Sequence, residues 1–128
     1  MKQVLHTDSA PKAVGPYSQA IRMGDFLFCS GQISIDPKTQ EVFTGAIQQQ
    51  TEMVLNNVEA ILKNSNLNFS HVIKTTIFLT SMADFASVNE VYAKRFTKDP
   101  PARSTVAVAG LPKGVNVEIE VIANFEAN

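Results

Sequence analysis

The sequence predicts an α+β fold in which a mixed β-sheet carries two α-helices on one face. Short segments in which apolar residues alternate with other residues occur near both ends of the chain and in its middle, and this period of two is typical of strands. Two longer segments carry apolar residues at helical spacing. A chain of 128 residues can bury one sizeable core, so we assign residues 1–128 to a single domain.

The first third of the chain is predicted to form strands joined by loops. Residues 2–6 fit a short edge strand, and the small residues and prolines that follow it indicate a loop. A strand ending at Met23 and a strand over residues 26–30 flank Gly24-Asp25, which is typical of a two-residue hairpin turn because glycine supplies a positive φ. Gly31 directly after the second strand predicts a bulge or a close approach of the backbone to another group.

Two helices are predicted, over residues 46–63 and over about 82–96. The first ends at Asn64-Ser65-Asn66, because asparagine tolerates the left-handed conformation. Between the helices, residues 72–79 read as a strand with Ile73, Ile77 and Leu79 on one face. The apolar residues that the second helix directs inward are Phe85, Val88, Tyr92 and Phe96.

Residues 101–123 are predicted to form a hairpin of two strands joined at residues 110–114. Arg103 and Thr105 share one face of the first strand, while Glu118 and Glu120 share one face of the second. If the apolar faces of the two strands coincide, Arg103 meets both glutamates on the other face.

One face of the predicted sheet has no helix to cover it, because two amphipathic helices cover only one face. This second face is too mixed to be core and too apolar to be fully exposed. We expect it to meet another copy of the chain. Its predicted residues are Lys74, Thr76, Phe78, Arg103, Glu118 and Ile122.

Composition and charge exclude several classes of function. A net charge of -1 gives no basic surplus for nucleic acid, so we expect no nucleic-acid partner. Cys29 is the single cysteine, and the two histidines, His6 and His71, have no ligand spacing, so we expect no metal site. The N-terminus has no signal-like apolar stretch and no apolar run approaches bilayer length, which predicts a cytoplasmic protein without a membrane partner.

Arg103 is the strongest functional candidate that the residues alone provide. Its planar guanidinium can bind a carboxylate through two charge-assisted hydrogen bonds, but it can equally pair with Glu118 or Glu120. Glu118 can activate a water molecule or be a solvated surface carboxylate. Tyr17 can present its hydroxyl to a ligand or pack beside a strand. The residues therefore predict an anion-binding pocket without specifying a reaction.

Several motifs, in order along nearly the whole chain, resemble the Rid/YjgF family. These motifs are Gly15-Pro16-Tyr17-Ser18-Gln19-Ala20, Ser30-Gly31-Gln32, Val72-Ile73-Lys74-Thr75-Thr76-Ile77-Phe78-Leu79, Phe85-Ala86-Ser87-Val88-Asn89, Pro101-Ala102-Arg103-Ser104 and Val117-Glu118-Ile119-Glu120. The resemblance implies a chorismate-mutase-like α+β fold, assembled as a homotrimer with binding sites between subunits. It also implies hydrolysis of 2-iminobutanoate and 2-iminopropanoate, products of pyridoxal-phosphate-dependent dehydratases, to 2-oxo acids and ammonia, with no cofactor.

The resemblance also assigns roles to individual residues. Arg103 would bind the substrate carboxylate with help from the Gly31 backbone N–H, and Glu118 would activate the attacking water. Tyr17, Ser30 and Asn89 match further positions of the pocket, with Tyr17 contributed across the subunit boundary. Thr105 stands where many members of the family have cysteine, and we expect it to alter the shape of the pocket.

Two alternatives to the deaminase remain at this stage. A non-catalytic trimer that binds small carboxylates and regulates a partner enzyme would need Arg103 but not Glu118. An endoribonuclease or translation inhibitor is less consistent with the absence of a basic patch. The presence of both Arg103 and Glu118 favours catalysis.

Overall fold

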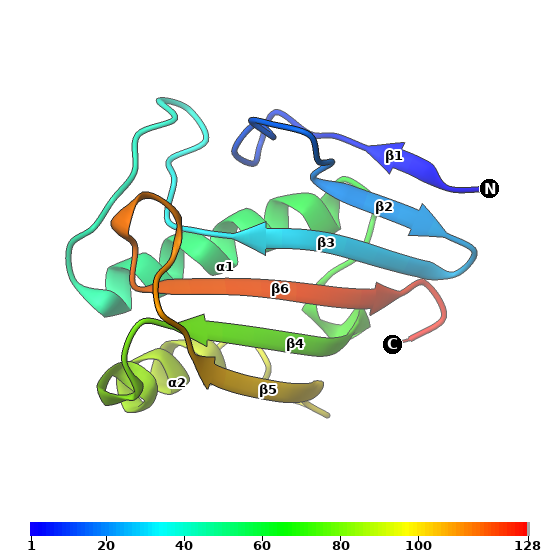
Figure 1. Cartoon of the computed structure of the whole chain (residues 1–128). Coiled ribbons are helices and arrows are strands. Elements are labelled where there is room, and N and C mark those ends of the chain that lie inside the picture. Colours follow the sequence, from blue (N-terminus) through cyan, green and yellow to red (C-terminus); the bar gives the residue numbers. More distant parts are fainter. Residues whose placement is uncertain (128) are drawn as a thin grey trace.

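The structure, a computed structural model, describes residues 1–127, and a six-stranded mixed sheet forms its centre (Figure 1). The strands are β1 (Gln3–Leu5), β2 (Ala20–Met23), β3 (Phe26–Gln32), β4 (Val72–Leu79), β5 (Ala102–Ala107) and β6 (Val117–Asn124). The helices are α1 (Ile47–Lys63) and α2 (Phe85–Ala93), with short 3₁₀ turns η1 (Phe69–His71), η2 (Met82–Asp84) and η3 (Pro112–Gly114). The order across the sheet is β1-β2-β3-β6-β4-β5, which leaves β1 and β5 at its edges.

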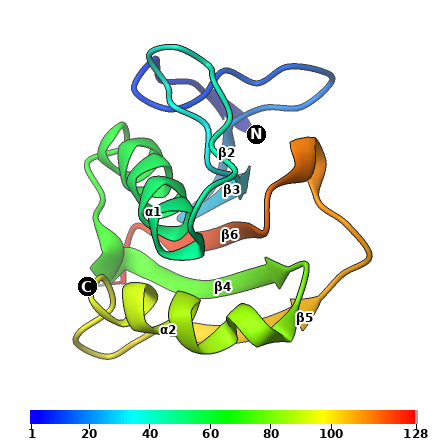
Figure 2. The same ribbon diagram turned by 90° about the vertical axis from the view of Figure 1, so that its left-hand side faces the viewer.

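Both α-helices pack on the same face of the sheet, as Figures 1 and 2 show. The helix-facing residues of β6 alternate with outward-facing ones, so Val117, Ile119 and Val121 are buried against the apolar side of α1. This arrangement confirms the predicted α+β fold with two helices on one face of a mixed sheet.

Several local predictions are confirmed by the backbone. Gly24 has a φ of 59° in the turn that pairs Met23 with Phe26, as a two-residue hairpin requires. Asn66, with a φ of 60°, lies in the left-handed region just after α1. The register of β3 against β6 shifts between Cys29 and Gln32, which is the bulge expected at Gly31.

The second helix and one strand differ in detail from the prediction. The predicted helix at 82–96 is divided into η2 and the shorter α2, which ends at Ala93, although Phe96 is still buried. In β4 a register shift between Val72 and Lys74 turns Ile73 outward, and this side chain is 38% exposed. A bulge breaks the alternation that a regular strand would keep, so Ile73 does not share the face of Ile77.

The predicted hairpin over residues 101–123 is wrong. Strand β4 lies between β5 and β6, pairing parallel with β5 and antiparallel with β6. The connection over residues 108–116 is long enough to pass across the end of β4, where the Val108 N–H donates to the Leu79 carbonyl. A period of two identifies a strand but does not identify the strand with which it pairs.

The face of the sheet without helices carries apolar side chains that are partly exposed. Phe26 and Phe28 are 42% and 45% exposed with ring centroids 6.1 Å apart, and Val106 is 43% exposed. The register places Glu118 beside Phe78 and Glu120 beside Thr76 on this same face. We call this surface the open face. Arg103 is the exception among the predicted residues of this face and is considered below. The register confirms the other five, Lys74, Thr76, Phe78, Glu118 and Ile122.

Buried amide side chains fix the loops that lead into the strands. Gln50 exchanges hydrogen bonds with Asn116: its amide donates to the Asn116 side chain at 2.9 Å, and the Asn116 backbone N–H donates to its carbonyl oxygen at 2.9 Å. The Asn116 amide also donates to the Thr80 hydroxyl at 3.0 Å. These contacts anchor the start of β6, and thereby the position of Glu118, to α1 and to the end of β4.

None of the helices within residues 1–127 is long and apolar enough to cross a membrane.

Candidate active site

Arg103 lies on the edge strand β5 and faces α2. Its Nη1 donates to Oδ1 of Asn89 at 2.7 Å, and its Cζ lies 5.0 Å and 5.5 Å from the ring centroids of Tyr92 and Phe85. These two rings attract the cation through their π faces. Among residues 1–127, no carboxylate forms an ion pair with Arg103. We call Asn89, Tyr92, Arg103 and Thr105 the edge cluster.

Tyr92 is held in place beneath the guanidinium. Its hydroxyl and that of Thr75 are 2.7 Å apart and both residues are buried. Burial raises the pKa of Tyr92, while the hydrogen bond with Thr75 and the charge of Arg103 act in the opposite direction. Tyr92 is therefore neutral at physiological pH and acts as a rigid wall.

Thr105 follows Arg103 on the same face of β5, beside Ile77 of β4. Its hydroxyl oxygen is buried and has no hydrogen-bond partner within residues 1–127. A buried hydroxyl without a partner destabilises the fold by about 1–3 kcal/mol, so a group outside this part of the chain, or a rotation of the side chain, is needed to satisfy it.

A cavity of about 440 Å³ opens beside the edge cluster, between the C-terminal half of α2 and the segment that leads into β5. Aromatic rings and prolines form most of its wall, and the Arg103 guanidinium contributes the charge. The lining residues are Asn89, Tyr92, Ala93, Phe96, Pro100, Pro101 and Arg103.

Glu118 lies on the open face against the bulge of β3. A Cβ atom added to Gly31 would lie 2.8 Å from the carboxyl carbon of Glu118, so the close approach requires glycine at this position. The Ser30 hydroxyl donates to the Ser18 carbonyl at 2.6 Å, and this bond joins the bulge to the segment that carries the exposed Tyr17. We call Tyr17, Ser30, Gly31 and Glu118 the bulge cluster.

The environment of Glu118 favours its protonated form. Burial raises the pKa of this half-buried carboxyl above its ordinary value of 4.5, and the charge of Glu120 on the same face raises it further. A carboxylate with a raised pKa is a stronger base near neutral pH, which is the property that activation of a water molecule requires.

Arg103 and Glu118 do not lie on the same face of the sheet, contrary to the prediction. Arg103 pairs with Thr75 in register and Thr75 pairs with Val121, so Arg103 is on the helix side. Glu118 pairs with Phe78 on the open face. Because β4 intervenes between β5 and β6, Arg103 does not pair with Glu118 or Glu120 within one chain.

The structure therefore groups the predicted site residues into two clusters. Asn89 and Thr105 accompany Arg103, whereas Ser30 and Gly31 accompany Glu118. Sequence reasoning missed Tyr92 as a wall of the candidate site, because an apolar position of a helix was interpreted as core only. Its position three residues after Asn89 on the same helix was the available signal.

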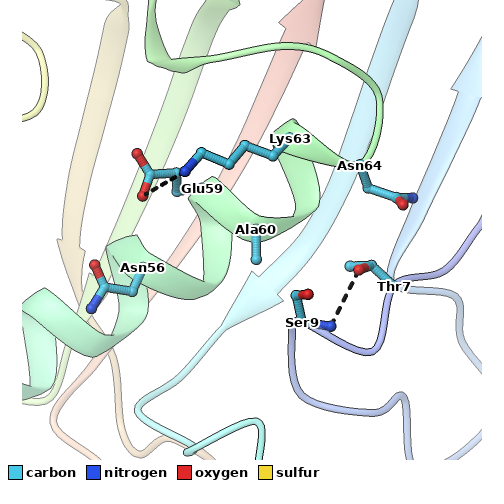
Figure 3. A pocket seen from close by; sticks show the side chains of 7 residues that line it. All are labelled: Thr7, Ser9, Asn56, Glu59, Ala60, Lys63 and Asn64. Carbon is cyan, nitrogen blue, oxygen red and sulfur yellow. Dashed lines mark hydrogen bonds and ion pairs between the residues drawn. The ribbon is translucent and has the colours of Figure 1, made fainter.

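Three other features within residues 1–127 differ from this site. A second depression, of about 460 Å³, lies between α1 and the N-terminal loop and is lined by polar residues that include the exposed ion pair of Glu59 and Lys63 (Figure 3). Burial raises the pKa of Cys29 to about 12, so its thiol is unreactive. Within residues 1–127, no group of three or more His, Cys, Asp or Glu side chains could hold a metal ion.

Comparison with known proteins assigns the chain to a family. The family described as Endoribonuclease L-PSP matches residues 7–125. The chain belongs to this family, which is the Rid/YjgF family that the sequence motifs indicated.

Individual relatives carry different names. The chain is 52% identical over 124 residues to Protein DfrA of Myxococcus xanthus, covering 95% of each chain. It is 48% identical over 124 residues to Reactive Intermediate Deaminase A, chloroplastic, of Arabidopsis thaliana, covering 97% of this chain and 66% of that protein. The crystal structure of E. coli TdcF with bound serine matches with a TM-score of 0.91 and 42% identity, covering 95% of this chain and 98% of that one.

Proposed function

We propose that this protein is a hydrolytic deaminase that converts small 2-imino acids, such as 2-iminobutanoate and 2-iminopropanoate, to 2-oxo acids and ammonia. The observation that carries the proposal is the state of Arg103. Asn89 and two aromatic rings hold this guanidinium in place, and no carboxylate within residues 1–127 neutralises it. A ligand carboxylate supplies the missing charge. The relative with bound serine, also a small carboxylate, supports this class of ligand.

The two clusters act together only if two chains contribute to one site. Arg103 and Glu118 lie on opposite faces with β4 between their strands, so a small substrate cannot contact both within one chain. In a homotrimer, the edge cluster of one chain meets the bulge cluster of the next. The partly exposed Phe28 and Val106 on the open face favour such an assembly, because contact with other copies removes them from water.

The chemistry needs few groups. Arg103 and the Gly31 N–H orient the substrate through its carboxylate, and Glu118 accepts a proton from a water molecule as the water oxygen bonds to the C=N carbon. The electron pair of the C=N bond moves to nitrogen, which takes the proton that Glu118 has just accepted. Glu118 then carries the proton of the new hydroxyl group to the nitrogen as C=O forms and the C–N bond breaks, so one water is consumed and one ammonia leaves with the 2-oxo acid.

A coupled assay tests the proposal. A threonine dehydratase generates 2-iminobutanoate in place, and the rate of 2-oxobutanoate formation is followed with and without the protein. We expect the protein to accelerate this step above the rate in buffer. A rate equal to that in buffer, from protein that still binds 2-oxobutanoate, would refute the deaminase and favour a regulatory carboxylate-binding protein.

Replacing Gly31 with alanine is expected to lower kcat/KM by about 10- to 100-fold, because the new methyl group displaces the Glu118 carboxylate from its position. The fold should survive, since the displaced atoms are the end of a flexible side chain. Thermal denaturation and the coupled assay measure the two effects separately.

Gly110→Ala is the matched control for this substitution. A Cβ at Gly110 meets nothing within 4 Å, so its activity and thermal midpoint should equal those of the wild type. Equal activity of Gly31→Ala and the wild type would show that the contact between Gly31 and Glu118 has no role in the reaction.

A further inference from the structure

The cavity beside Arg103 is larger than the small imino acids of the proposed reaction require. Its volume of about 440 Å³ is within the range of about 300–1,000 Å³ that is typical of pockets for larger small molecules. In the single chain, a four-carbon imino acid whose carboxylate binds Arg103 fills only part of this space. The cavity therefore has room for a longer side chain on the same carboxylate.

The walls of the cavity are suited to an apolar group. The buried rings of Tyr92 and Phe96 line it with their centroids 4.4 Å apart, while Pro100 and Pro101 border it from the segment before β5. Neither ring offers a polar atom to a ligand. The Tyr92 hydroxyl is hydrogen-bonded to Thr75, and Phe96 has no polar side-chain atom. Charge enters only through Arg103, which Asn89 fixes at one wall.

We propose that this cavity is the side-chain pocket of the active site and that the protein prefers 2-imino acids with branched or aromatic side chains over those with one or two side-chain carbons. The preference among imino acids as substrates rests on the proposed function, whereas the binding of the side chain in this cavity does not. Arg103 holds the carboxylate, and the side chain of the substrate extends along Tyr92 and Phe96 toward the two prolines. Each methylene buried there strengthens binding by about fourfold.

Binding of the 2-oxo acid products tests the pocket independently of catalysis. Calorimetry gives the Kd of pyruvate, 2-oxobutanoate, 4-methyl-2-oxopentanoate and 3-phenyl-2-oxopropanoate. We expect 4-methyl-2-oxopentanoate to bind at least about tenfold more tightly than 2-oxobutanoate, since two further carbons are buried. Affinity that does not rise with the side chain would overturn the proposal, even if the coupled assay shows a deaminase.

A variant that fills the cavity identifies its location. Ala93 is exposed and lines the cavity, so Ala93→Phe places a ring inside it without disturbing the core. The wild type is expected to bind 4-methyl-2-oxopentanoate more tightly than 2-oxobutanoate. We expect this variant to reduce the ratio of these two affinities at least about tenfold. Lys94→Phe, which adds the same ring one position along the chain and outside the cavity lining, should leave the ratio unchanged.

The outcomes separate the two proposals. A preference for longer side chains that Ala93→Phe removes and Lys94→Phe keeps supports the pocket, whether or not the protein hydrolyses imines. A preference that both variants keep would place the side chain elsewhere and overturn this assignment. If the preference is present and imine hydrolysis is absent, the side-chain pocket stands and the deaminase fails.

Discussion

Replacing Arg103 with alanine is expected to lower kcat/KM for 2-iminobutanoate by about 100- to 1,000-fold, because two charge-assisted hydrogen bonds to the substrate carboxylate are lost. The residue is on the surface of the single chain and has no ion pair within residues 1–127, so its removal should change the thermal midpoint little. Arg103→Lys should recover only part of the activity, since an ammonium group cannot form the paired contacts.

Arg95→Ala is the matched control for this prediction. The Arg95 guanidinium donates to Glu52 at 3.0 Å and to Asn56 at 2.7 Å, so it connects the segment just after α2 to α1 outside both clusters. Loss of the Arg95 side chain should lower the thermal midpoint and leave kcat/KM within about twofold of the wild-type value. Activity of Arg103→Ala within about threefold of the wild type would contradict the carboxylate-binding role.

Glu118→Gln is expected to lower kcat/KM by at least about 100-fold and to stabilise the protein near pH 7. The pKa of Glu118 is raised in the folded protein by burial and by Glu120, so ionising this group costs more in the folded than in the unfolded state. The stability associated with its protonated form is complete below 4.5 and is lost as pH rises through the raised pKa. Glutamine does not ionise, so the variant keeps the stability that the wild type loses at higher pH.

Thermal denaturation across pH tests this prediction. The variant should melt above the wild type near pH 7, and the difference should disappear as pH falls below about 4. In the wild type, kcat/KM should fall at acidic pH with a pKa above 4.5, as Glu118 becomes protonated.

Glu120→Gln supplies the control, because it lies on the same face and exerts only a charge effect on Glu118. It should remain active, with the acidic limb of its pH profile moved to lower pH. An inactive Glu120→Gln together with an active Glu118→Gln would show that the base is Glu120 and not Glu118.

Local patterns in the sequence predicted the elements of the fold well. Apolar spacing predicted α1 within one residue of its observed start, and Gly24 and Asn66 marked chain reversals that need a positive φ. Strand pairing was predicted less well. Residues 101–123 have the alternation of a hairpin, but β4 inserts between their strands, and alternation contains no information about which neighbour a strand selects.

The same limit applied to the candidate site. Arg103 and Glu118 were identified because their chemistry is distinctive, and Gly31 because a glycine after a strand indicates close approach. The division into two clusters could not be predicted, since it depends on the order of strands across the sheet. The contact of Arg103 with Tyr92 depends on the parallel pairing of β5 with β4, which brings the edge strand beneath α2.

We expect each active site to take Arg103 from one chain and Glu118 from the next. Mixing the inactive variants Arg103→Ala and Glu118→Gln in equal amounts, followed by unfolding and reassembly, tests it directly. In randomly mixed trimers three quarters contain both variants, and each of these has one site with both native residues among three, so about a quarter of wild-type activity should return. Activity no greater than the sum of the two separate variants would contradict the claim.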